Sequence, residues 1–297
     1  MTLDRIGLIG FGEAGGILAS DLAAQGVAVQ VYDLLLDDES QRPALETKAA
    51  NAGVLVCNSA AQAITGAALV ISAVTAGSAI DVARTAATTL QPGQLFMDIN
   101  SVAPATKQAA AEAINAAGGR YVDAAVMAPV PPKRLQTPML LGGRDAAELS
   151  AALNARGFAT RVVADEVGVA SAIKMCRSVM IKGLEALTTE CLMTARHYGA
   201  ETEVLASLHK SFPSMGWDGE LPHYLISRVA EHGRRRAEEM EEVAETVRAA
   251  GVEPHMSEAI VQTQRGLVEA ISTRGLRYAD LEPFDWPAVA DRLRPPA

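Results

Sequence analysis

The sequence predicts an α/β fold, with a doubly wound parallel sheet at the N-terminus and an all-helical C-terminal domain. A glycine-rich turn lies between an apolar segment and a helical one near the start of the chain. Strand and helix signals then alternate up to about residue 165, which is typical of parallel βαβ units. After that point only helical patterns follow. We therefore predict a Rossmann-type dinucleotide-binding domain over residues 1–165 and an all-helical substrate-binding and dimerisation domain over 166–297.

The glycine-rich turn has the spacing of a dinucleotide-binding fingerprint. Its first glycine permits the tight turn, its second lets the backbone approach a pyrophosphate, and its third lets helix and strand pack closely. The phosphates would lie against backbone N–H groups at the positive end of the helix. The residues predicted to contact the cofactor here are Gly10, Phe11, Gly12, Glu13, Ala14 and Gly15.

Asp33 follows the second apolar run and is predicted to choose between NAD and NADP. Its distance from the first glycine is close to the roughly 20 residues typical of an acid that binds the ribose hydroxyls. A 2′-phosphate would meet this carboxylate and three further acids at 37–39, with Arg42 as the nearby cation. Because like charges at close range disfavour binding, NAD is predicted and NADP is the less favoured cofactor.

Short apolar runs and helical stretches give the order of elements. The predicted strands are 27–32, 54–57, 69–74, 95–99 and 121–126, with 139–143 and 160–163 completing the sheet. The predicted helices are 17–25, 79–89, 105–117, 170–198, 231–250 and 257–273. The helix over 170–198 is apolar around most of its circumference, which predicts burial on several sides. The proline-rich tail after residue 283 is expected to be peripheral.

Composition restricts the class of protein. A net charge of −9 argues against a nucleic-acid or membrane-surface partner. The three cysteines lack paired or metal-type spacing, as in a reducing cytoplasm, and the five histidines show no zinc-site spacing. No apolar run reaches the ~20 residues that span a bilayer, and no export signal is visible. We expect a soluble cytoplasmic protein with no metal site.

A second chemical signal lies at the start of the long helix. Lys174, Arg177 and Ser178 fall on one helix face, three and four positions apart, among apolar residues. Buried unpaired charge is expensive, so these side chains need a reason. Lys174 either pairs with a carboxylate of the other domain or serves chemistry, and the residues alone leave both open.

Four motifs, in order, resemble those of the β-hydroxyacid dehydrogenase family, which includes 3-hydroxyisobutyrate and 6-phosphogluconate dehydrogenases. They are the fingerprint, the segments 96–104 and 123–129, and the stretch from Gly168 to Lys174. The resemblance covers nearly the whole chain. It implies a nicotinamide-side segment that includes Asn100 and Ser101, and a substrate loop at Met127 and Ala128. Val74 and Thr75 are also expected to contact the cofactor. Ser101 is expected to contact both the cofactor and the substrate.

Departures from the family pattern put the substrate in doubt. The family's Ser-Gly-Gly is replaced by Met127-Ala128-Pro129, and Ser178 stands where asparagine is expected. The family's Lys-Asp-Leu aligns with residues 238–240, downstream of an arginine run at 234–236. This pattern resembles a phosphogluconate-dehydrogenase-like subgroup. Arg177 and Arg235 could hold an anionic substrate through bidentate contacts, whereas i,i+4 pairs with glutamates explain the run equally well as a solvated face.

The resemblance and the residues together predict an NAD-dependent oxidoreductase for a small anionic hydroxy acid, sugar-acid-like or a 3-hydroxy acid. Lys174 is the expected general acid and base, with Ser178 and Asn100 holding the substrate oxygen or the lysine. Decarboxylation or isomerisation could follow oxidation. The alternatives are an imine-reductase-like enzyme, which Lys174 and Asp33 disfavour, and a non-catalytic dinucleotide-binding regulator. A two-fold homodimer through residues 170–290 is also expected.

Overall fold

The computed structural model describes residues 2–294, and its contacts divide the chain into two compact units, up to Met175 and from Cys176 onward. This division lies within one continuous helix, whereas the sequence placed the boundary near residue 165. The domain roles assigned from the sequence stay predictions. Among the described residues, no helix is long and apolar enough to cross a membrane.

The N-terminal unit is an eight-stranded sheet in the order β3-β2-β1-β4-β5-β6-β7-β8. Every neighbouring pair is parallel except β6 and β7, which are antiparallel. The chain order reverses between β1 and β4, and ligands of doubly wound folds bind at such a point. The strands are β1 (Arg5–Ile9), β2 (Ala28–Tyr32), β3 (Leu55–Val56), β4 (Leu69–Ser72), β5 (Leu95–Asp98), β6 (Arg120–Val126), β7 (Pro138–Gly142) and β8 (Ala159–Ala164). The predicted Rossmann-type fold class is therefore confirmed.

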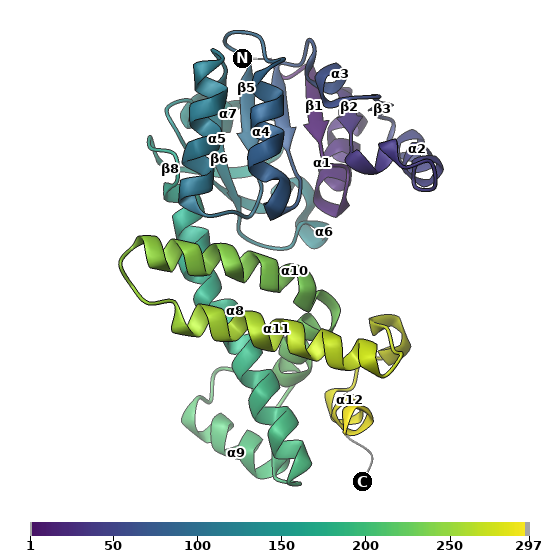
Figure 1. The fold of residues 1–297 in the computed structure, drawn as a ribbon, viewed down its shortest axis with the longest axis vertical. Helices are drawn as coiled ribbons and strands as arrows, with labels where there is room; N and C mark the ends of the chain where they lie inside the picture. The colour runs from purple at the N-terminus through teal and green to yellow at the C-terminus, as the bar shows by residue number, and fades with distance from the viewer. Residues whose placement is uncertain (1, 295–297) are drawn as a thin grey trace. The chain divides into compact units, whose positions relative to one another are not determined.

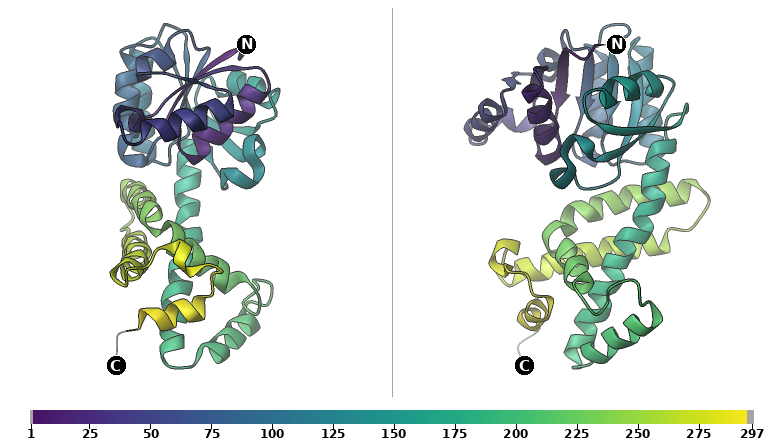
Figure 2. Two further views of the ribbon diagram at one scale, coloured as in Figure 1. Left: turned by 90° about the vertical axis from the view of Figure 1, so that its right-hand side faces the viewer. Right: turned by 180° about the vertical axis from the view of Figure 1, so that it is seen from behind.

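Helices cover both faces of this sheet, because alternate strand residues feed two separate apolar cores. On one face Ile6 and Leu8 pack with Leu18 and Leu22 of α1. On the other, Ile9 and Phe96 pack with helices α4 and α5, which lie in front of the sheet in Figure 1. The view from behind in Figure 2 shows the opposite layer. The helices are α1 (Glu13–Ala24), α2 (Arg42–Ala52), α3 (Ala60–Ile64), α4 (Ala79–Ala87), α5 (Pro104–Ala116), α6 (Val130–Lys133) and α7 (Ala146–Asn154).

Up to residue 294, the C-terminal unit contains helices and no strand, as predicted. Helices α10 and α11 form an antiparallel pair (Figure 1), and their closest approach requires a glycine. A Cβ atom on Gly233 would lie 2.2 Å from the carbonyl oxygen of Gln264. The elements are α8 (Val169–His197), which begins in the first unit, α9 (Glu201–Ser211), α10 (Leu221–Ala249), α11 (His255–Thr273) and α12 (Trp286–Leu293).

Two expectations for the helical region are wrong. Helix α10 begins at Leu221 rather than near 231, because Pro222 occupies its first turn, where proline is tolerated. The tail is not merely peripheral, since Trp286 of α12 is buried in the core of this unit. Much of helix α8 is buried, in contrast, as its apolar pattern predicted, and within the described chain Met180 and Leu187 remain 74% and 58% exposed.

Candidate active site

The glycine loop after β1 is shaped by close backbone contacts. Gly10 has φ +95°, and a Cβ atom there would lie 2.3 Å from the carbonyl oxygen of Ala73. A Cβ on Gly15 would lie 2.1 Å from the carbonyl oxygen of Gly10. Gly12, in contrast, has no atom within 4 Å of its Cβ position, so the loop is open on that side. These are the features that a dinucleotide pyrophosphate requires: two tight packing glycines and one open approach.

Asp33, at the end of β2, is fixed against this loop. Its Oδ2 accepts a hydrogen bond of 2.6 Å from the backbone N–H of Phe11, and its Oδ1 accepts one of 3.0 Å from Leu35. An ionised carboxylate has about four acceptor positions, so capacity remains for ribose hydroxyls. Glu13 and Ala14 lie in the first turn of α1, next to the open side of the loop. The residues of this edge thus fit a dinucleotide.

Asn100 joins the ends of β4 and β5. Its side-chain Oδ1 accepts a 2.7 Å hydrogen bond from the N–H of Val74, and its Nδ2 donates to Ser72 Oγ at 2.9 Å. The residue is 4% exposed. Both ends of the amide therefore hold the strand ends together. Beside it, the Ser101 hydroxyl is buried without a hydrogen-bond partner among residues 2–294, and Thr75 Oγ1 lies 3.3 Å from Ser78 Oγ.

A fully buried lysine lies beneath these loops. Lys107 Nζ, on α5, lies 2.9 Å from an Asp98 carboxylate oxygen and 3.4 Å from one of Asp123. It also donates to the Asp98 carbonyl at 2.6 Å. The hydroxyl of Tyr121 donates to the other Asp98 oxygen at 2.8 Å. Burial, and then the neighbouring Asp98 charge, raise the pKa of Tyr121 well above its usual value, so this tyrosine stays a neutral donor.

Asp123 anchors the start of the helix that carries Lys174. Its Oδ2 lies 3.1 Å from the backbone N–H of Gly168, and 3.1 Å from both the N–H and the hydroxyl of Ser171. These donors are helix-terminal groups that the helix itself cannot satisfy. Lys174 lies three residues after Ser171 and therefore on the same helix face. The sequence-predicted catalytic lysine is thus held, through its helix, by a buried carboxylate on β6.

The predicted substrate loop after β6 is half-buried. Met127 packs against a small apolar cluster that includes Ala125, Leu140 and Ala170. Its N–H donates to the carbonyl of Pro138 at 2.9 Å. Ala128 follows in an intermediate environment. Hydroxyl and glycine donors are absent from Met127-Ala128-Pro129, as the sequence indicated.

In the helical unit, Ser178 lies beside a buried lysine that the sequence analysis did not select. Lys182 is 4% exposed. Its Nζ lies 2.7 Å from a Glu239 carboxylate oxygen and 3.5 Å from Ser178 Oγ. Burial lowers the pKa of Lys182, although the Glu239 charge opposes this shift. The signal was available in the sequence, since Lys182 lies one helical turn after Ser178 on the same face.

One arginine of the run lies inward, and another makes the i,i+4 pair that the sequence indicated. Arg236 is the arginine that lies inward, 2.7 Å from Glu185, and Gln264 donates to the same glutamate at 3.2 Å. Burial raises the pKa of Glu185. Arg177 is exposed, and Arg235 is an exposed partner of Glu239. The predicted anion-binding roles of Arg177 and Arg235 stay predictions, and the inward cations are Lys182 and Arg236.

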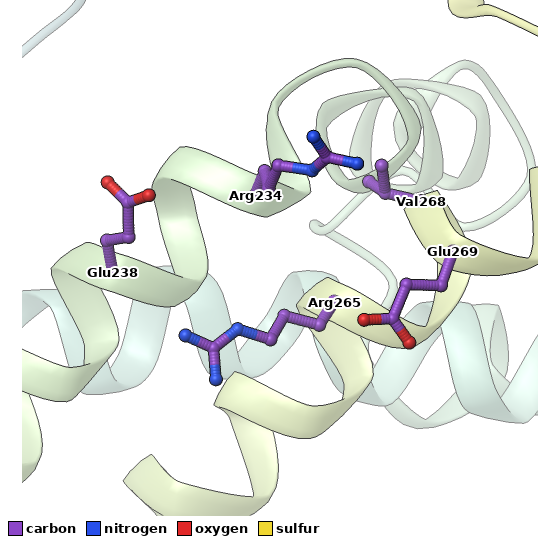
Figure 3. Close-up of a pocket in the computed structure, with 5 residues that line it drawn as sticks. All are labelled: Arg234, Glu238, Arg265, Val268 and Glu269. Atoms are coloured by element: carbon purple, nitrogen blue, oxygen red, sulfur yellow. The ribbon is translucent and has the colours of Figure 1, made fainter. Parts of the chain in front are cut away.

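A surface hollow of about 310 Å³ lies between α10 and α11. It is lined by Arg234, Glu238, Arg265, Val268 and Glu269. Figure 3 shows Arg234 reaching across toward Val268. Two arginines and two glutamates give this hollow no net charge, so it offers no general attraction for an anion. Among the described residues, no group of three or more histidine, cysteine or acidic side chains could hold a metal ion.

The fold and the loop define a dinucleotide-binding α/β protein, and comparisons with known proteins indicate a nicotinamide cofactor. Residues 5–162 match the NAD binding domain of 6-phosphogluconate dehydrogenase, and residues 195–267 match a domain of unknown function, DUF1932. The chain belongs to the β-hydroxyacid dehydrogenase family. The resemblance stated from its motifs is thereby confirmed.

Individual relatives support the same assignment. A conserved hypothetical protein from Sinorhizobium meliloti 1021 is 38% identical, with 98% of this chain and 97% of that chain covered and a TM-score of 0.76. The conserved protein MTH1747, described as structurally similar to 3-hydroxyacid dehydrogenases, is 35% identical over 89% and 97%, with a TM-score of 0.70. A 3-hydroxyisobutyrate dehydrogenase from Pseudomonas aeruginosa is 28% identical over 71% of each chain.

Replacement of Lys107 by methionine should strongly destabilise the N-terminal unit. The variant keeps the side-chain volume but leaves Asp98 and Asp123 buried without their cation, and breaking a buried pair in this way costs about 3–5 kcal/mol. Urea unfolding of purified protein measures the loss. Lys210→Met, on the exposed last turn of α9, is the control and should be near neutral. Equal unfolding midpoints for the two variants would contradict the role given to Lys107.

Proposed function

We propose that the protein is an NAD-dependent dehydrogenase that interconverts a small anionic hydroxy acid and its oxo counterpart, with Lys174 as the proton carrier. The observation that carries the proposal is the anchoring of the Lys174 helix by Asp123 within the same unit as the glycine loop. The similar protein from Pseudomonas aeruginosa is named a 3-hydroxyisobutyrate dehydrogenase. This name supports a 3-hydroxy-acid substrate, and a sugar-acid-like substrate is the other candidate in the proposal.

The cofactor, when bound, supplies the hydride chemistry, and the chain supplies the proton. Lys174 would take the hydroxyl proton during oxidation and return it during reduction. Lysine suits this role when its pKa falls from about 10.4 toward neutrality. Asn100, whose amide is engaged with Val74 and Ser72, contributes by fixing the strand ends, and Ser178 by hydrogen bonding. Decarboxylation or isomerisation of the oxidised product remains part of this proposal.

Two other functions make different demands on the same residues. An imine-reductase-like enzyme typically lacks the lysine and prefers NADP, so Lys174 and Asp33 disfavour it. A non-catalytic dinucleotide-binding regulator would bind NAD without turnover. A turnover screen of the purified protein with NAD against branched and straight C4–C6 sugar acids and hydroxy acids separates enzyme from regulator.

Asp33→Ala should weaken NAD binding and narrow the preference for NAD over NADP. The carboxylate both holds the Phe11 N–H and would repel a 2′-phosphate. Calorimetric titration of each variant with NAD and NADP measures the two affinities. A wild-type protein that binds NADP more tightly than NAD would refute the preference, and an unchanged affinity ratio in the variant would remove Asp33 from it.

Lys174→Ala should leave the NAD affinity nearly intact and reduce kcat by roughly 10²–10⁴-fold, which is the usual contribution of general acid–base catalysis. Initial rates with the substrate found by the screen, together with NAD titration, measure the two effects. Lys174→Arg is the matched variant. It keeps the charge but cannot give up a proton at accessible pH, so it should be equally slow. Substantial activity in either variant removes Lys174 from the mechanism.

We also propose that this is a cytoplasmic homodimer, paired through its helical unit. Met180 and Leu187 lie seven residues apart on α8 and are largely exposed, with Ile181 beside them 40% exposed. Side chains seven apart share one helix face, which is the spacing of paired helices. An apolar stripe of this kind favours a partner surface over water, and a second copy presents the same stripe.

Charge placed on this stripe should separate the copies. Met180→Glu combined with Leu187→Glu puts two carboxylates into the expected contact, and light scattering at micromolar concentration should change from a dimer to a monomer of about 31 kDa. Met256→Glu, at an exposed apolar position on α11, is the control. A monomeric wild-type protein would refute the proposal, as would a double variant that stays dimeric.

A further inference from the structure

Lys48, on α2, reaches the glycine loop from outside the fingerprint. Its Nζ donates to the carbonyl oxygens of Phe11 at 2.6 Å and of Gly12 at 2.8 Å. The same ammonium lies 4.5 Å from the centre of the Phe11 ring, within the range of a cation–π contact. Three contacts therefore hold one lysine head group against the two residues at the tip of the loop.

Gly16 makes room for this lysine. A Cβ atom on Gly16 would lie 2.8 Å from Lys48 Nζ and 2.9 Å from its Cε, and otherwise only 3.8 Å from the Phe11 ring. Gly16 belongs to neither the tight turn nor the open approach of the fingerprint. Its absent side chain is explained by the passage of Lys48 over α1.

The charge at this position matters because acids surround the loop. Asp33 and Glu13 act on Lys48 electrostatically and raise its pKa, while burial lowers it by a larger effect. Without Lys48, a pyrophosphate that approaches Gly12 would be repelled by two carboxylates and attracted by the N-terminus of α1 alone. An ammonium has three N–H donors, and the acceptors found among residues 2–294 use two of them.

We infer that Lys48 is a dinucleotide-binding residue, which braces the glycine loop through two carbonyls and offers its third N–H and its charge to the cofactor's phosphate or ribose oxygens. This inference rests on the proposed function only in that the ligand is a nicotinamide dinucleotide. Lys48 also places a positive charge near Asp33, so the cofactor would meet both the Asp33 carboxylate and the Lys48 ammonium.

A double-mutant cycle between positions 16 and 48 tests the inference by calorimetric titration with NAD, without a need for turnover. Lys48→Ala should weaken NAD binding about tenfold, the effect of losing one charge-assisted contact. Gly16→Ala keeps the charge but displaces the head group, so it should also weaken NAD binding. In the Lys48→Ala background, Gly16→Ala should have no further effect.

The control is Arg84→Ala, which removes a cation that is 65% exposed on α4 and should bind NAD like the wild type. The NAD affinity of the wild type should also fall more steeply with salt than that of Lys48→Ala. Wild-type affinity in Lys48→Ala, additive losses in the double variant, or equal salt dependence would each overturn the inference while NAD binding itself stands. A wild-type protein that binds neither NAD nor NADP would overturn the proposed function as well.

Discussion

Three charged groups buried inside the N-terminal unit, Lys107, Asp98 and Asp123, impose the constraint on which the candidate site depends. The Lys107 ammonium is shared between the two carboxylates at a place without solvent, so it cannot satisfy all of their acceptor positions. The remaining stabilisation must come from fixed donors. They are the Tyr121 hydroxyl, the N–H of Asn100 and the groups at the start of α8. These donors therefore require the end of β5, strand β6 and the start of α8 to lie close together around the three buried groups.

This requirement connects the buried charges to two parts of the candidate site, the loop after β4 and the start of the Lys174 helix. Asp98 Oδ1 accepts from the Asn100 N–H at 2.8 Å, and the Asn100 side chain in turn holds Val74. Asp123 acts in the other direction, on Ser171 and hence on the turn that precedes Lys174. In a simple core, all three charged residues together could be replaced by well-packed apolar residues without loss of stability. The presence of the two carboxylates is understandable if they hold the loop after β4 and the start of the Lys174 helix in fixed positions.

The sequence alone predicted the elements with strong periodicity, the fingerprint and the lysine helix, because those depend on local pattern. The contacts that organise the site were not predictable in the same way. Lys107 lies in an ordinary helical stretch, and nothing in its neighbours shows that it is fully buried. Lys48 reaches Phe11 across 37 positions of the chain, and Gly16 acquires its meaning only from that contact. Lys182 could have been selected from its spacing to Ser178, but its pairing with Glu239 could be known only once α10 was placed beside α8.

The pattern of ion pairs in the helical unit also limits how a substrate anion could be recognised. Lys182 and Arg236 each face a buried or half-buried glutamate, and Arg235 shares Glu239 with Lys182. An anion that approached these cations would have to displace an internal carboxylate, which would itself lose a partner. Cations whose charge is already matched attract a ligand weakly. An arginine-rich helix is therefore weak evidence of anion binding. The number of cations without an internal carboxylate partner is more informative than the total number of cations.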